Sequence, residues 1–160
     1  MEIVVDDELE ASFTPPDMIS EAVMMSCQVA GYSDRQPELC VRFATDAAVH
    51  ELNAKWRDRD QVTDVLSFPM QEGPDFDFQE SLGDIALALP FVLSEASRLN
   101  LAERDHMLHL IIHATLHLLG YDHIEDDDAE KMQQLEREAM QRLHLHDPYP
   151  LIAKESPEIL

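Results

Sequence analysis

Basic residues are scarce in this chain of 160 residues: 11 are Lys or Arg, against 33 Asp or Glu, for a formal net charge of −22. So acidic a surface repels phosphate backbones and attracts basic proteins, and it favours solubility. A broad nucleic-acid-binding face is therefore excluded. Any role on nucleic acid must depend on a local basic patch, a metal ion or a basic partner protein.

Cysteines and long apolar runs are also scarce. Cys27 and Cys40 are the only cysteines, form no CxxC pair and lie in apolar segments, so we expect two buried thiols rather than a disulfide. Residues 1–7 lack a basic region followed by an apolar stretch, and no uncharged apolar run reaches the roughly 18 residues that span a bilayer. We expect a protein of the reducing cytoplasm with no membrane segment.

The apolar pattern predicts strands interspersed with helices, which indicates an α+β or mixed-sheet domain. We expect one domain over residues 1–147 and, because of its prolines, an irregular tail over residues 148–160. The expected strands cover residues 3–5, 39–44, 65–68 and 82–89, the last closed by Pro90. The expected helices run from Thr14 as cap to Ala30, from Asp46 as cap to Trp56, and over residues 91–99, 103–119 and 127–143.

The helix expected over residues 103–119 is apolar nearly all round, so we expect it to be the buried central helix. His113 and His117 lie one turn apart on it, since each residue turns by about 100°, and both can reach one ion. Gly120 follows the apolar run, and a chain reversal there would bring back His123 as a third ligand. Three histidines leave one coordination position open for water or substrate, as in catalytic zinc sites. Zinc suits three neutral imidazoles best, although nickel, copper or iron would also accept them.

Hydrolysis is the reaction class that such a site favours. The spacing HxxxHxxGxxH is shared with the metzincin metallopeptidases, whose HExxHxxGxxH pattern supplies a glutamate as general base. Ala114 stands at that position here and cannot take a proton. Because a positioned general base contributes roughly 10²- to 10⁴-fold, peptide hydrolysis would require an acid from elsewhere in the chain.

Three of the few basic residues gather in one segment. Lys55, Arg57 and Arg59 fall within five positions beside Trp56, the only tryptophan. Arginine suits phosphate oxygens, and a tryptophan can stack on a base, so this segment is the best candidate for holding an anion. The alternatives are surface ion pairs between the arginines and neighbouring aspartates, and a core position for Trp56.

Three motifs together resemble one known family. HATLHLLGYDH at residues 113–123, with TDVLSFP at 63–69 and LGDI at 82–85 upstream, is similar to the YbeY family of metal-dependent rRNA-maturation endoribonucleases. The family pattern around the metal is HGxLHLxGYDH, and every fixed position matches except the glycine, which is Ala114 here. The resemblance extends from about residue 38 to 147 and includes the spacing of Asn53, Arg57 and Asp60.

The resemblance implies a single α+β domain with a mixed four-stranded sheet, about five helices and one zinc ion held in a cleft by His113, His117 and His123. It implies a cytoplasmic enzyme that cuts single-stranded RNA in small-subunit rRNA maturation and ribosome quality control. Arg57 matches a catalytic or phosphate-binding arginine of the family. We expect Lys55 and Arg59 to contact nucleic acid and His109 to line the cleft or support a ligand.

The residues leave several points open. Asp84 and Asp122 are candidates for the general base by motif proximity, and a 2′-hydroxyl nucleophile is an alternative to water. A metallopeptidase with an atypical base and a non-catalytic zinc module that docks a basic small-subunit ribosomal protein are the competing functions. The oligomeric state is not indicated by the sequence.

Overall fold

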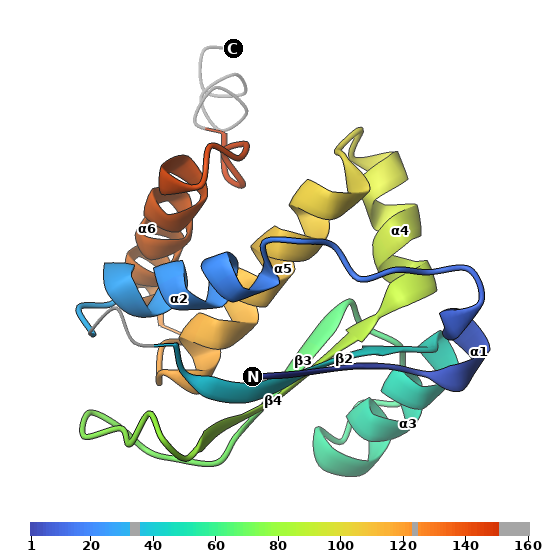
Figure 1. The fold of residues 1–160 in the computed structure, drawn as a ribbon, viewed down its shortest axis with the longest axis horizontal. Coiled ribbons are helices and arrows are strands. Elements are labelled where there is room, and N and C mark those ends of the chain that lie inside the picture. Colours follow the sequence, from blue (N-terminus) through green and yellow to red (C-terminus); the bar gives the residue numbers. More distant parts are fainter. Residues whose placement is uncertain (33–35, 123–124, 151–160) are drawn as a thin grey trace.

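A four-stranded sheet forms the centre of the computed structural model, which describes residues 1–32, 36–122 and 125–150 (Figure 1). Its strand order is β1 (Glu2–Val5), β2 (Glu38–Ala44), β4 (Ser81–Ala88) and β3 (Val65–Pro69). β1 pairs with β2 and β2 with β4 in parallel, whereas β3 pairs antiparallel to β4. The mixed α+β domain expected from the sequence is therefore confirmed, with β3 as an edge strand.

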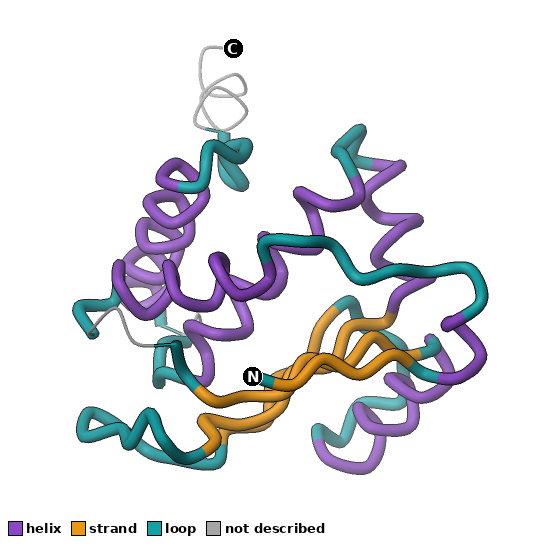
Figure 2. The backbone as a smooth tube through the Cα atoms, viewed as in Figure 1, coloured by secondary structure: helices purple, strands orange, loops and turns teal. Residues whose placement is uncertain are grey.

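Helices cover both faces of this sheet (Figures 1 and 2). The helices α2, α5 and α6 lie above the sheet in Figure 1, and α3 lies below it. The described residues contain six helices, one more than expected: α1 (Asp7–Glu10), α2 (Ile19–Val29), α3 (Asp46–Trp56), α4 (Leu89–Arg98), α5 (Glu103–Leu118) and α6 (Asp126–Arg142). The extra helix, α1, has four residues and buries none of them, so it leaves no apolar periodicity to detect.

The central position expected for the histidine-bearing helix is confirmed. Ten of the sixteen residues of α5 are buried, among them Leu108, Ile111 and Leu116 with no exposed surface. These residues share the main core with Val23 of α2 and Ile85 of β4. Burial on nearly every side fixes the position of α5 within the domain, and with it the backbone from which any cleft-facing side chain of α5 extends.

Gly83 lets two elements approach β4 closely. Its φ is +144°, and a Cβ added there would lie 2.3 Å from the carbonyl oxygen of Phe68 and 2.9 Å from Leu118 Cδ2. Phe68 belongs to β3, and Leu118 is the last residue of α5. Glycine at this position therefore sets how closely β3 and the end of α5 approach one another across the sheet.

Three expected boundaries were wrong. Helix α2 begins at Ile19, after Met18 with a φ of 71°, and not at Thr14, because a residue that precedes proline disfavours the helical region. The N-cap of α3 is Thr45, whose side chain accepts a hydrogen bond from the Ala48 amide, and Asp46 instead accepts one from the amide of Phe91 in α4.

Pro90 is the third correction: it does not close the strand but lies in the first turn of α4, where its missing N–H is tolerated.

Other expectations concern thiols and membranes. Cys27 and Cys40 are both free, as the absence of a CxxC pair indicated. Cys27 is buried as expected, but Cys40 is only half-buried, so the expectation of two buried thiols was wrong for Cys40. Within the described ranges, no helix combines the length and the apolar character needed to cross a bilayer.

Candidate functional site

The helix that carries His113 and His117, α5, ends in a chain reversal. Leu119 closes the helix, the Gly120 amide donates to the carbonyl of His117, and the Tyr121 amide donates to the carbonyl of Leu116. This paired pattern, with Gly120 at a φ of +96°, is the Schellman ending that glycine favours. The chain reversal expected at Gly120 is therefore confirmed.

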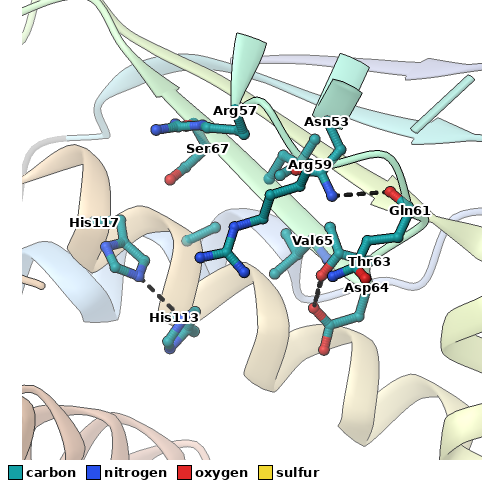
Figure 3. Close-up of a pocket in the computed structure, with 12 residues that line it drawn as sticks. Asn53, Arg57, Arg59, Gln61, Thr63, Asp64, Val65, Ser67, His113 and His117 are labelled. Atoms are coloured by element: carbon teal, nitrogen blue, oxygen red, sulfur yellow. Dashed lines mark hydrogen bonds between the residues drawn. The ribbon is translucent and has the colours of Figure 1, made fainter. Parts of the chain in front are cut away.

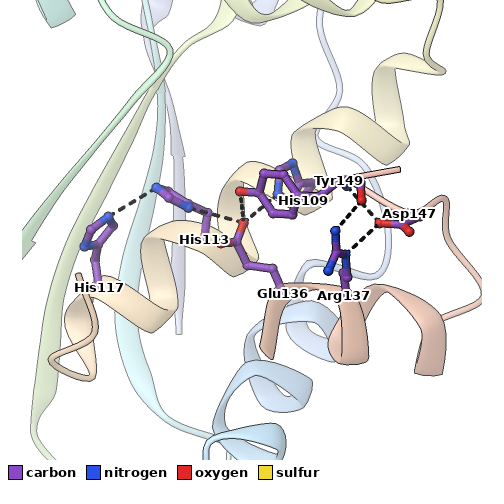
Figure 4. Close-up of polar contacts among 7 residues, drawn as sticks. All are labelled: His109, His113, His117, Glu136, Arg137, Asp147 and Tyr149. Carbon is purple, nitrogen blue, oxygen red and sulfur yellow. Dashed lines mark hydrogen bonds and ion pairs between the residues drawn. The ribbon is translucent and has the colours of Figure 1, made fainter. Parts of the chain in front are cut away.

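His113 and His117 face each other at the end of this helix (Figure 4). Their Nε2 atoms lie 3.2 Å apart, and their ring centroids lie 4.6 Å apart with the rings nearly perpendicular. Two nitrogens bound at about 2.0–2.1 Å to one tetrahedral zinc ion would be separated by about 3.3 Å. The two imidazoles therefore have the spacing that a shared metal ion requires.

The expected third ligand, His123, lies outside the described residues. Among the residues that are described, no group of three or more His, Cys, Asp or Glu side chains could hold a metal ion. The three-histidine zinc site accordingly stays a prediction, supported by the geometry of two of its members.

A buried glutamate that the sequence analysis did not single out contacts the histidine helix from α6. Glu136 is 1% exposed. Its Oε1 lies 2.6 Å from His109 Nε2 and 3.3 Å from His113 Nδ1, and it accepts a hydrogen bond of 2.9 Å from the Tyr149 hydroxyl (Figure 4). The sequence held one signal for it: Glu136 falls at helical spacing from Met132 and Met140, both fully buried, and so occupies a core position of α6.

The environment of Glu136 keeps it charged. Burial alone would raise the pKa of this carboxyl group, but the hydrogen bonds and charges of His109 and His113 lower the pKa to about 2. Burial, together with the same carboxylate, raises the pKa of the Tyr149 hydroxyl, which therefore stays a protonated donor.

A cleft of about 410 Å³ opens beside the two histidines (Figure 3). One wall is α5, with His113, Ala114 and His117. The other walls are β3 and the loop between α3 and β3, whose lining side chains include two arginines and, among the described residues, one carboxylate, Asp64. In a chain of net charge −22, this cleft gathers positive charge next to candidate metal ligands.

Asn53 holds the arginine loop in place. It is 2% exposed, and its backbone carbonyl accepts hydrogen bonds from the amides of Arg57 (3.0 Å) and Arg59 (3.1 Å). Its side-chain amide donates to the carbonyl of Gln61 at 2.9 Å. The loop that carries both arginines is thus fixed to the end of α3 by a single buried residue.

The two arginines point differently. Arg57 donates through Nη2 to the carbonyl of Ser67 on β3, and its guanidinium lies 5.2 Å from the centre of the Phe68 ring. Figure 3 shows Arg59 directed into the cleft, toward His113 and His117. Both residues line the cleft, as a phosphate-binding role would require, and Arg59 is the one that faces the histidines.

Lys55 and His109, two further residues that the sequence singled out, lie outside this cleft. Lys55 lies with its Nζ 5.1 Å from the ring of Trp56, which is 61% exposed and therefore does not belong to the core. His109 lines a smaller neighbouring cavity and contacts Glu136. His109 and His113 are therefore linked through the Glu136 carboxylate, which both contact.

Neither of the two aspartates expected as general base, Asp84 and Asp122, is among the residues that line the cleft. Asp84 pairs with Cys40 and Phe68 and shares the alternation of Ala86 and Ala88, so it faces α3, on the side of the sheet opposite α5. Asp122 is half-buried beyond the end of α5 and is not among the residues that line the cleft. Asp64 lines the cleft, although sequence reasoning considered it only as an ion-pair partner for the arginines.

Ala114 occupies the position at which metzincins carry their glutamate. It is 1% exposed and lines the cleft beside His113, so that position supplies a methyl group and no carboxylate.

Comparisons with known proteins agree on one family. The sequence model of the family Endoribonuclease YbeY matches residues 6–144. Proteins named Endoribonuclease YbeY from Sinorhizobium fredii and Azorhizobium caulinodans are 38% identical over 151 residues and 36% identical over 158 residues. These alignments cover 90% and 96% of this chain, and 84% and 98% of the two relatives. A relative of the same name from Rhizorhabdus wittichii is 47% identical over 121 residues, covering 71% of this chain and 72% of its own length.

A solved structure shares the fold. The solution structure of TM1509 from Thermotoga maritima superposes with a TM-score of 0.52 at 24% identity, covering 94% of this chain and 99% of that one. At this level of identity, the likeness supports the arrangement of helices and strands alone.

Proposed function

The chain belongs to the YbeY family of endoribonucleases, and from that premise we propose that it is a cytoplasmic, metal-dependent endoribonuclease. Its proposed substrate is single-stranded RNA, and its proposed role is small-subunit rRNA maturation and ribosome quality control. One observation carries the proposal: two histidines one turn apart and two arginines line the same cleft of an otherwise strongly acidic protein. Histidines suit a metal ion and arginines suit phosphate oxygens.

One zinc ion would be held by His113 and His117, with His123 as the predicted third ligand. The spacing of 3.2 Å between the two Nε2 atoms supports this assignment, as does the contact of His113 Nδ1 with Glu136, which leaves Nε2 to face the ion. When bound, the ion supplies Lewis acidity toward a phosphoryl oxygen and activates water.

The arginines would bind and stabilise the phosphate. Arg59, directed into the cleft, is suited to hold a phosphate beside the histidines. Arg57, fixed by the Ser67 carbonyl and the Phe68 ring, presents its remaining N–H groups to the negative charge that develops as the phosphodiester is attacked. Because the backbone carbonyl of Asn53 holds both residues, the pair is pre-organised before substrate binds.

As the attacking oxygen forms its bond to phosphorus it must lose a proton, while the bond from phosphorus to the leaving oxygen breaks and that oxygen takes up a proton from water. Asp64 is the carboxylate among the described lining residues, and we assign it the role of proton acceptor. Its Oδ1 already accepts a hydrogen bond of 2.7 Å from the amide of Val65, which orients the group.

A single strand suits the surface next to the cleft. Trp56 is 61% exposed and lies against Lys55, one residue before Arg57. An exposed aromatic ring beside a cation can stack an unpaired base, which a duplex does not offer.

The test is cleavage of a fluorescent single-stranded oligoribonucleotide by zinc-loaded protein. We expect His117→Ala and Arg57→Ala each to lower kcat by roughly 10²- to 10³-fold, the size of effect seen when one positioned electrostatic group is removed. The charge-matched control is Arg142→Ala, which removes one cation from the end of α6 outside the cleft and should cleave normally. Undiminished cleavage by both cleft variants would contradict the proposal and indicate a contaminating nuclease.

Lys55→Ala separates binding from chemistry. Because Lys55 lies outside the cleft, its loss should raise KM a few-fold and leave kcat unchanged. A loss of kcat instead would place Lys55 in the reaction itself.

The acidic surface supports a basic partner protein, and we propose a small-subunit ribosomal protein in that role. Such a partner would bring an enzyme of net charge −22 to RNA that its own surface repels. Ribosome association should survive Arg57→Ala while rRNA processing fails. If processing also survives, the chain acts as a non-catalytic module.

A further inference from the structure

The buried carboxylate of Glu136 requires an explanation that the core does not give. Glu136 is 1% exposed at a position of α6 whose helical neighbours Met132, Ala139 and Met140 are fully buried or nearly so. A carboxylate removed from water is strongly destabilising unless hydrogen-bond donors replace the water it loses. An apolar residue would fill the same position without that cost, so the charge must serve its contacts.

Those contacts converge on one atom. The Oε1 atom of Glu136 accepts from the Tyr149 hydroxyl at 2.9 Å and lies 2.6 Å from His109 Nε2 and 3.3 Å from His113 Nδ1 (Figure 4). Of these three partners, only His113 also lines the cleft. Glu136 thus joins two residues outside the cleft to one inside it.

The contact determines which ring nitrogen of His113 is available. A carboxylate can only accept, so His113 carries its proton on Nδ1 when it bonds Glu136, and the lone pair stays on Nε2. Nε2 is the atom that lies 3.2 Å from His117 Nε2. Glu136 therefore selects the tautomer and the ring orientation that a metal ligand needs.

Tyr149 reaches Glu136 from beyond the last helix. Asp147 Oδ1 accepts from the Tyr149 amide at 2.8 Å and from Arg137 Nε at 3.3 Å, and Arg137 Nη2 donates to the Tyr149 carbonyl. Arg137 follows Glu136 directly on α6, so the segment that carries Tyr149 is attached beside the carboxylate. Tyr149, expected in the irregular tail over residues 148–160, thereby contacts α6.

We propose that Glu136 and Tyr149 are positioning residues for His113: Glu136 holds the imidazole, and Tyr149 holds Glu136. This inference rests on the proposed function and deepens it, because it assigns Tyr149, which follows α6, a part in positioning a metal ligand. It does not depend on the RNA step, since tautomer and metal affinity can both be measured without RNA.

The test compares wild type with Glu136→Gln and Tyr149→Phe. Zinc affinity is measured by competition with a chromogenic chelator, and the His113 tautomer by ¹H–¹⁵N NMR on metal-free protein. We expect Glu136→Gln to weaken zinc binding by roughly 10- to 100-fold, as loss of such a partner typically does, and to mix the two His113 tautomers. For Tyr149→Phe we expect a smaller loss, of several-fold.

The chain offers matched controls for both changes. Glu95 of α4 pairs with His106 Nε2 on α5 at the same distance of 2.6 Å. Because its histidine partner is His106 and not one of the two histidines that line the cleft, Glu95→Gln should leave zinc affinity unchanged. Tyr32→Phe removes a hydroxyl from a half-buried tyrosine that packs against Phe76 and Phe78. It should likewise have no effect.

Folded variants with wild-type zinc affinity and a single His113 tautomer would overturn the inference, as would equal losses in the controls. Should Glu136→Gln fail to fold, Tyr149→Phe and Arg137→Ala, which releases Tyr149, still decide the question. If wild type keeps a single His113 tautomer that the variants lose, yet cleaves no RNA, the proposed function fails and this inference stands.

Discussion

Gly83→Ala should destabilise the protein through a collision that can be located in advance. The new Cβ would lie 2.3 Å from the Phe68 carbonyl oxygen, 2.9 Å from Leu118 Cδ2 and 3.0 Å from Pro69 Cα. Two of these atoms are backbone, which cannot move aside without separating β3 from β4. The change therefore affects the strand and the helix that form opposite walls of the cleft.

The expected cost has two parts. A non-glycine residue at a φ of +144° costs about 1–3 kcal/mol in backbone strain. Forcing a methyl group into a filled space typically costs a further 1–3 kcal/mol. We expect a total of about 2–6 kcal/mol, a large share of the roughly 5–15 kcal/mol by which domains are usually stable.

The assay is urea unfolding followed by circular dichroism, in the presence of EDTA so that metal binding does not contribute. Gly31→Ala is the matched control, because Gly31 also has a positive φ, +90°, but its added Cβ would meet nothing within 4 Å. That control should lose only the contribution of backbone strain, about 1–3 kcal/mol. Equal losses in the two variants would refute the steric argument, and would mean that β3 and α5 yield easily at this point.

Three further outcomes are expected. Burial raises the pKa of Asp6, but Arg42 and a backbone amide more than offset it and hold the pKa below its usual range. Asp6→Asn should therefore cost about 1 kcal/mol at pH 7, a modest figure because the Arg42 side chain is 38% exposed. Unfolding curves should show this cost fading as pH falls below about 4, through the folded-state pKa; a constant cost would contradict the ion pair. Ala114→Gly should lower thermal stability by about 1 kcal/mol, as glycine does inside a helix, and unchanged stability would mean that the Ala114 methyl is strained. Burial raises the pKa of Cys27 to about 12, so a thiol reagent should modify Cys40 in the native protein before Cys27, and the reverse order would contradict this burial.

The helices and strands could be predicted from the sequence because each has a local pattern that a few neighbouring residues reveal. The alternation at residues 39–44, the apolar stretch of α5 and the glycine that ends it all follow from local preferences. The predicted start of α2 was wrong because two conformational effects of proline compete there. Proline favours the first turn of a helix, yet it also disfavours a helical residue before it.

In the site, too, the residues that could be predicted are those set by local spacing in the chain. The spacing of His113 and His117 on one helix is a local property, and the cleft contains both, with Arg57 and Arg59. Glu136 and Asp64 depend on which elements meet in space, and one histidine spacing cannot reveal that. The position of Asp84 shows the converse: the LGDI motif is one of the three motifs that carry the family resemblance, yet strand alternation turns its carboxylate to the opposite face of the sheet.

The contact between Arg57 and Ser67 also affects whether a second chain can pair with the edge strand β3. β3 is an edge strand, and an edge strand with open carbonyls is a template on which a second chain can add. Arg57 occupies the Ser67 carbonyl at this edge, and Pro69, which cannot donate, ends the strand. A variant without Arg57 would lose a cation from the cleft and also expose this edge to intermolecular pairing. The side chain proposed to stabilise the substrate phosphate thus also occupies one of the carbonyls at which a second chain could pair.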